Sequence, residues 1–147
     1  MQYSVRFFIS WILAAVLMYV AFYVWHGLFL NDLSRITFSK TVFMILAALV
    51  YLVISFVLYR AYNSRLARKI YNQFLRGVIT GAALGFILFA VITVLGISFT
   101  KNVTFTYMVA DCGWQVVEQC IGGIIVALGH ILIFEPSPEF ERISRSE

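Results

Sequence analysis

The chain has 147 residues, of which 62% are hydrophobic and 12% charged, and its mean hydropathy is +0.91. A soluble domain is about half apolar, and a globule this short has too much surface to hide so many apolar side chains. The composition therefore excludes an ordinary soluble domain and predicts a single membrane-embedded one. The net charge is +4, and the basic residues are clustered. In a chain this apolar, a basic cluster indicates membrane topology rather than nucleic-acid binding.

Four apolar stretches follow one another along the chain, at residues 7–30, 41–59, 77–99 and 112–134. Each is near the roughly 20 residues that a helix needs to cross the hydrocarbon core. Lipid cannot form hydrogen bonds with free backbone groups, so a span must be a helix or part of a closed barrel. The stretches lack the period-two alternation of a barrel, so we expect helices. The first stretch is too long for a signal-peptide core, so we expect it to be retained. We predict an all-α, four-helix transmembrane bundle over residues 1–134 and a polar C-terminal tail over residues 135–147.

The loops share the basic residues unevenly. The segment 60–76 contains five of the eleven, namely Arg60, Arg65, Arg68, Lys69 and Arg76. The positive-inside rule places this segment in the cytoplasm, and four spans then place both termini there as well. The basic residues that remain on the outer side are Arg35, Lys40 and Lys101.

The segment between the second and third spans also has an apolar residue at every fourth position. These residues are Tyr62, Leu66, Ile70 and Phe74. Their spacing predicts one apolar stripe on a helix that extends a span or lies on the inner leaflet. The basic residues expected near lipid phosphates at this membrane surface are Arg65, Arg68 and Lys69. A docking site for a protein partner is the alternative. For residues 100–111 we expect an extended or interfacial connection, because Thr, Val, Phe and Tyr predominate there.

Small residues mark faces for helix packing. Gly77, Gly81 and Gly85 are four positions apart and share one face of the third span. Such a face lets another helix approach closely, which strengthens dispersion packing in lipid. Gly122 belongs to a looser series of small residues in the fourth span. We expect the third and fourth spans to pack on each other, and a homodimer seam is the alternative.

Ionisable residues occur in the fourth span. Asp111, Trp114 and Glu118 are three and four positions apart, so they share a helix face that begins at the outer end. A charged group at mid-membrane costs about 2.5–3.5 kcal/mol on insertion scales. We therefore expect Glu118 to face the bundle and to be protonated or paired.

The end of the first span supplies partners for these groups. The sequence YVWHGLFLND contains Trp25, His26 and Asp32, and it ends on the same side as Asp111. We predict an outer-side polar cluster with a binding role, and we expect Glu118 to contact His26 or polar groups of the second or third span. The cluster consists of His26, Asp32, Asp111, Trp114 and Glu118. The alternative is a structural clasp in which the tryptophans belong to an aromatic belt.

No catalytic residue and no metal site are predicted. His26 and His130 lie near opposite ends of the bundle, and the acidic residues near His26 have no specific ligand spacing. His130 is expected to be a separate hydrogen-bonded residue. A haem attachment motif is absent from the sequence, and the cofactor, if there is one, is left unknown.

The stretches WHGLFLNDL and GWQVVEQCIGGIIVALGH resemble the first and last spans of uncharacterised small four-span bacterial membrane proteins. The resemblance covers about a fifth of the chain. It implies a location in the bacterial cytoplasmic membrane and brings no activity with it. Small multidrug exporters also have four spans and one membrane glutamate, but theirs lies in the first span, so their mechanism is not carried over to Glu118.

Three classes of function follow. The first is a non-enzymatic integral membrane protein that binds a lipid, another hydrophobic ligand or a larger membrane complex. The second is a small oligomeric transporter that uses Glu118 as a coupling carboxylate. The third is a membrane enzyme with an outer-facing His/Asp/Glu site. The expected partners are membrane lipids, with a second copy or a membrane complex as further candidates and no nucleic acid.

Overall fold

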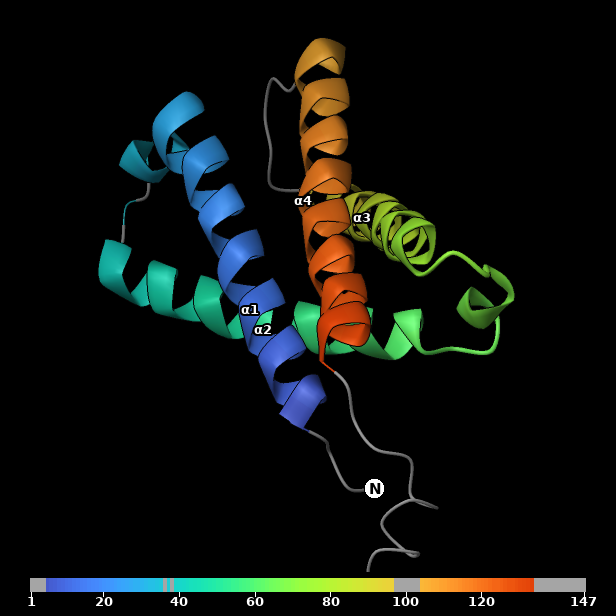
Figure 1. The fold of residues 1–147 in the computed structure, drawn as a ribbon. Coiled ribbons are helices and arrows are strands. Elements are labelled where there is room, and N and C mark those ends of the chain that lie inside the picture. The colour runs from blue at the N-terminus through green and yellow to red at the C-terminus, as the bar shows by residue number, and fades with distance from the viewer. Residues whose placement is uncertain (1–4, 36, 38, 97–103, 134–147) are drawn as a thin grey trace, which may run out of the picture.

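The computed structural model describes residues 5–35, 37, 39–96 and 104–133 (Figure 1), without the side chains of residues 32, 35, 95 and 96. Helix α1 continues directly into the π-helix η1, and two short 3₁₀ turns, η2 and η3, lie in the loops. In chain order the elements are α1 (Val5–Phe22), η1 (Tyr23–Phe29), η2 (Asp32–Arg35), α2 (Lys40–Tyr62), η3 (Ala67–Lys69), α3 (Gln73–Gly96) and α4 (Phe105–Leu132).

Four of these helical segments are long and apolar enough to cross a membrane: Val5–Phe29, α2, Gln73–Val94 of α3, and α4. The predicted all-α, four-helix transmembrane fold is thereby confirmed. Large apolar side chains are exposed on every span, such as Ile12, Val53, Ile92 and Val117. Lipid is the solvent for such a surface, so exposure of these side chains carries no hydrophobic penalty. Which face is cytoplasmic stays a prediction from the loop charges.

Helix α4 is the centre of the fold, because it packs against α1, α2 and α3. Figure 1 shows that α1 and α4 run in opposite directions, with the start of α1 and the end of α4 at the same end. Helix α2 crosses both of them steeply in the same view. Helix α3 packs mainly against α4.

The glycine face of α3 lies directly on the backbone of α4. A Cβ atom added at Gly77, Gly81 or Gly85 would overlap backbone atoms of α4. The carbonyl oxygens that they meet belong, in the same order, to Gly123, Gln119 and Gln115. Because α4 covers this face, a homodimer along the same face would have to displace α4.

The opposite face of α4 forms the core with α1 and α2. A Cβ atom at Gly122 would meet Met18 of α1 and Leu58 of α2, both of which are fully buried. Adjacent residues on a helix are about 100° apart, so Gly122 faces this core while Gly123 faces α3. The rest of the core cluster comprises Ala14, Tyr51, Tyr62, Val126 and Ala127.

The continuous helical stripe expected between the second and third spans is wrong. Tyr62 is the last residue of α2 and is fully buried, whereas Leu66 is 76% exposed in the loop of residues 63–72. Polar side chains interrupt the helix by binding backbone groups. Asn63 Nδ2 donates to the Tyr59 carbonyl, and Ser64 Oγ accepts from the Ala67 amide. Asn72 Oδ1 likewise accepts from the Leu75 amide at the start of α3.

Of the two alternatives expected for residues 100–111, the extended one is wrong from residue 105 onward, and the interfacial one stays a prediction. Residues 100–103 lie outside the described part of the chain. Helix α4 begins at Phe105, where the Thr104 side chain accepts a hydrogen bond from the Tyr107 amide at 3.3 Å. A threonine cap satisfies an otherwise unpaired amide, which explains the earlier start. Asp111 therefore lies within α4, nearly two turns after its first residue.

Candidate functional site

The π-helix η1 contains His26 of the predicted outer cluster, next to Trp25. The Leu30 amide donates to the Trp25 carbonyl at 2.9 Å, five positions back, which is the wider π-type turn. Single π turns occur often at functional sites because they redirect side chains. Here Trp25 and His26, neighbours in sequence, both contact Asp111 of α4.

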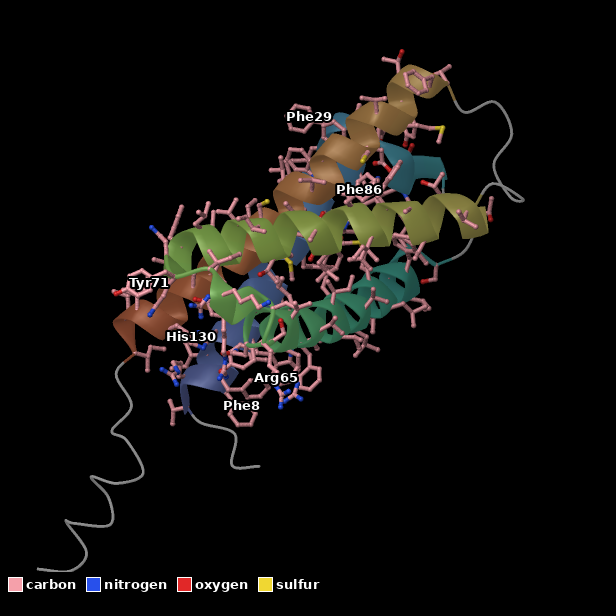
Figure 2. All side chains as sticks on the ribbon, turned by 90° about the vertical axis from the view of Figure 1, so that its right-hand side faces the viewer. Phe8, Phe29, Arg65, Tyr71, Phe86 and His130 are labelled. Carbon is pink, nitrogen blue, oxygen red and sulfur yellow. The ribbon has the colours of Figure 1, made fainter. Side chains whose placement is uncertain are left out.

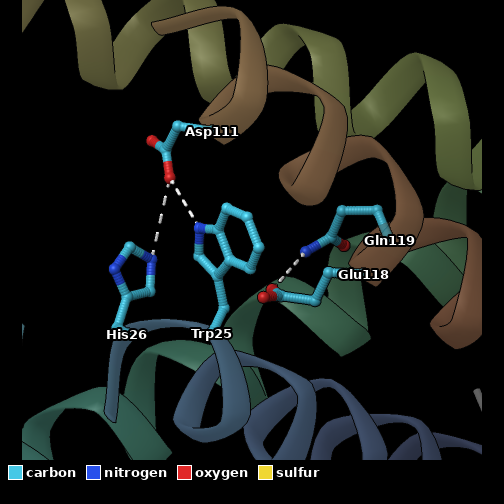
Figure 3. A network of polar contacts seen from close by, with 5 residues as sticks. All are labelled: Trp25, His26, Asp111, Glu118 and Gln119. Atoms are coloured by element: carbon cyan, nitrogen blue, oxygen red, sulfur yellow. Dashed lines mark hydrogen bonds and ion pairs between the residues drawn. The ribbon is translucent and has the colours of Figure 1, made fainter. Parts of the chain in front are cut away.

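Asp111 joins η1 to α4, as Figure 3 shows. Trp25 Nε1 donates to Asp111 Oδ1 at 3.3 Å, and His26 Nε2 lies 4.0 Å from the same oxygen. The indole of Trp25 stacks on Trp114, with ring centroids 4.6 Å apart and planes 8° apart. The His26 and Asp111 side chains are 25% and 31% exposed, so their attraction is modest even with a protonated imidazole. Trp25, His26, Asp111 and Trp114 together form the η1–α4 polar cluster.

Glu118 is not part of that cluster. Its side chain is 1% exposed, and it accepts a hydrogen bond from Gln119 Nε2 at 3.4 Å. The hydroxyl of Tyr51 on α2 faces the same carboxylate. In Figure 3 the Trp25 ring stands between the Asp111 contacts and the Glu118–Gln119 contact. Glu118 therefore faces a polar group of the second span, Tyr51, and does not contact His26.

Asp32 lies in η2, and its side chain falls outside the described part of the structure. Among the described residues, no group of three His, Cys, Asp or Glu side chains is placed to hold a metal ion. His26 and Asp111 by themselves supply two ligands, fewer than a structural zinc site uses.

His130 contacts polar groups at the other end of the bundle. Its Nδ1 lies 2.9 Å from the Val126 carbonyl, and its Nε2 lies 3.1 Å from Asn63 Oδ1. The rings of Tyr59 and Tyr62 pack against the imidazole, with centroids 5.5 and 4.8 Å away. His130 therefore joins the end of α4 to the end of α2, separately from Glu118.

A mostly apolar groove of about 300 Å³ opens between the end of α2, the loop of residues 63–72 and α3. The loop side includes Leu66, Ala67 and Ile70, and the α3 side includes Ile79, Ala83 and Ile87. Sequence reasoning missed this groove. The available signal was the spacing of four between Ile79, Ala83 and Ile87, which leaves a small residue between two large ones on one helix face.

Basic residues alternate with the groove residues along the same loop. Arg65, Arg68 and Lys69 are exposed, while their neighbours Leu66, Ala67 and Ile70 line the groove. Figure 2 shows the loop between α2 and α3, with Arg65 and Tyr71 projecting outward. Arg76 differs, because its Nε and Nη2 both donate to the Ile70 carbonyl, at 3.1 and 2.9 Å. Its guanidinium also lies over the Tyr62 ring, so Arg76 supports the loop.

A second hollow, of about 310 Å³, lies at the opposite end of α2. Its walls include Tyr23 and Gly27 of η1, Asn31 and Ser34, and Lys40 at the start of α2. Among the described residues of this wall, Lys40 is the one cation, in contrast to the three beside the groove.

Comparisons of the chain with protein-family models, with curated proteins and with solved structures found no match. The resemblance to small four-span bacterial membrane proteins therefore stays a prediction.

Proposed function

We propose that this protein is a non-enzymatic integral membrane protein that binds a membrane lipid, with an acyl chain in the groove between α2 and α3. The groove carries the proposal. It is apolar, has a volume of about 300 Å³ and lies on the lipid-facing side of two spans. From Ile79 to Ile87 it extends about 12 Å along α3, at 1.5 Å per residue. That length approaches the roughly 15 Å depth of one leaflet's hydrocarbon.

The loop charges support an orientation for this site. By the positive-inside rule, the loop of residues 63–72 faces the cytoplasm, so the bound lipid belongs to the inner leaflet. The resemblance noted above favours the cytoplasmic membrane of a bacterium. Tyr71, which is 98% exposed, suits the headgroup region, where tyrosine is enriched.

The burial of Glu118 favours this function over the transporter and the enzyme. A coupling carboxylate or a catalytic acid needs access to water or substrate during its cycle. Glu118 is instead enclosed by packed side chains and accepts a hydrogen bond from Gln119, with the Tyr51 hydroxyl facing its carboxylate. We assign it, together with the η1–α4 polar cluster, the structural task of joining α4 to η1 and α2.

Lipid retention by the purified protein tests the proposal. The protein extracted in a mild detergent should carry about one lipid per chain in native mass spectrometry. Ala83→Trp should remove that lipid, because the indole fills the groove that Ala83 lines. Ile92→Trp is the matched control on α3. Ile92 is exposed, and it lies on the opposite face of the helix from Ala83, nine residues further along. Equal lipid retention by wild type and a folded Ala83→Trp variant, or none by wild type, would overturn the proposal.

A further inference from the structure

The groove by itself cannot select one lipid from another. An acyl chain that moves from the bilayer into the groove exchanges one apolar environment for another, so it gains packing contacts and little hydrophobic free energy. Chemical selection must then come from polar groups near the end of the groove. The α3 wall between Ile79 and Ile87 offers Thr80 as its polar lining residue, whereas the loop wall adjoins Arg65, Arg68 and Lys69.

One segment of chain builds both the groove wall and the cationic edge. Leu66, Ala67 and Ile70 line the groove, whereas Arg65 just before them and Arg68 and Lys69 between them are exposed. The 3₁₀ turn η3, at Ala67–Lys69, holds this alternation. It is supported by the hydrogen bond from the Ala67 amide to Ser64 Oγ at 3.2 Å. A lipid with its chain in the groove therefore places its headgroup beside Arg65, Arg68 and Lys69.

These three cations are not neutralised by acidic side chains in the part of the chain that the structure describes. The described acidic side chains are Asp111 and Glu118, both on α4, and they contact His26, Trp25, Tyr51 and Gln119 instead. The guanidinium of arginine offers paired donors that match phosphate oxygens, and lysine adds a point charge.

We infer that the groove lipid is an anionic phospholipid whose phosphate is bound by Arg65, Arg68 and Lys69. This inference rests on the lipid-binding function proposed above and adds the chemical class of the headgroup. The protein would then bind one such lipid, and the acyl chain in the groove would position the phosphate beside the basic loop.

The test compares two lipids with identical acyl chains, phosphatidylglycerol and phosphatidylcholine, titrated onto delipidated protein and measured by native mass spectrometry. Wild type should bind the anionic lipid at least roughly tenfold more tightly, because each of the three basic residues contributes up to about a fivefold factor near an anionic group. The preference should fall several-fold in concentrated salt.

The discriminating variant is Arg65→Gln/Arg68→Gln/Lys69→Gln. It should bind both lipids about equally, because the preference for phosphatidylglycerol is lost. The control is Arg35→Gln/Lys40→Gln/Lys101→Gln, which removes the same charge from the other two loops and should keep the wild-type preference. Circular dichroism and gel filtration establish that both variants fold.

The outcomes separate the two claims. Equal binding of the two lipids by wild type would overturn the headgroup assignment and leave the lipid-binding function intact. The same would hold if the control lost the preference as fully as the loop variant, because the effect would then be net charge. Failure to bind either lipid would overturn the proposed function itself.

Discussion

Gly77 of α3 and Gly123 of α4 contact each other backbone to backbone, and neither leaves room for a Cβ atom. An added Cβ at Gly123 would overlap the Gly77 carbonyl, and one at Gly77 would overlap the Gly123 carbonyl. This reciprocal contact brings α3 onto α4 in a membrane, where dispersion rather than the hydrophobic effect drives helix association.

Gly123→Ala should therefore destabilise the protein, although alanine is the better helix former by about 1 kcal/mol. The forced separation of the two backbones should cost about 1–3 kcal/mol or more, which outweighs the gain in propensity. Gly113→Ala on the same helix is the control, because nothing lies within 4 Å of its added Cβ. Chemical unfolding in detergent should show a loss for Gly123→Ala and no loss for Gly113→Ala. Equal stability of the two variants would contradict the packing.

Glu118→Gln should fold almost as stably as wild type, because the amide keeps the size and a carbonyl acceptor for Tyr51 and Gln119. Glu118→Ala should lose about 2–4 kcal/mol, since it leaves a cavity and unpaired buried polar groups. Unfolding measurements on both variants test the structural assignment. Loss of a pH-dependent flux in proteoliposomes containing folded Glu118→Gln protein would instead favour a transporter.

The stacked pair Trp25 and Trp114 should produce a coupled exciton signal in the ultraviolet circular dichroism spectrum. Trp25→Phe and Trp114→Phe should each remove that signal, because a single indole cannot couple. Trp11→Phe should leave it, since Trp11 stacks on Phe7 and donates to the Leu52 carbonyl. A coupled signal that survives Trp114→Phe would contradict the stacked geometry.

His130 and Asn63 should be energetically coupled, because His130 Nε2 and Asn63 Oδ1 are 3.1 Å apart. The substitutions His130→Ala and Asn63→Ala should each destabilise the protein. The double variant should lose less than the sum, by about 0.5–1.5 kcal/mol. The pair of His130→Ala with Asn72→Ala provides the control, because Asn72 caps α3 and should add independently. Additivity of the first pair would show that the contact contributes nothing.

The loop of residues 63–72 should be accessible only from the cytoplasm. A single cysteine at the exposed Tyr71 should react with a membrane-impermeant maleimide only after the cells are opened. A cysteine at the exposed Thr37, in the loop before α2, should react in intact cells. Cys112 and Cys120 are replaced by serine in both variants. The reverse labelling pattern would invert the topology and move the lipid site to the outer leaflet.

Several features of this protein could be predicted from local sequence, because each depends on properties of a single helix. The length of an apolar run predicts a span, and a spacing of four puts Gly77, Gly81 and Gly85 on one face. The cluster of Arg65, Arg68 and Lys69 could also be recognised from their neighbouring positions in the sequence. The end of α2 and the start of α4 could not be predicted in this way. They depend on side chains, Asn63 and Thr104, that bind specific backbone groups.

Tertiary structure alone decided the partners of the polar residues and the position of the groove. The sequence placed Asp111 and Glu118 on one face of α4, yet Asp111 contacts Trp25 and His26 while Glu118 contacts Tyr51. Periodicity states which residues share a face, and it does not state which neighbouring helix that face meets at each depth. That depends on the angles at which the helices cross. Those angles follow from the positions where glycines let two backbones approach most closely.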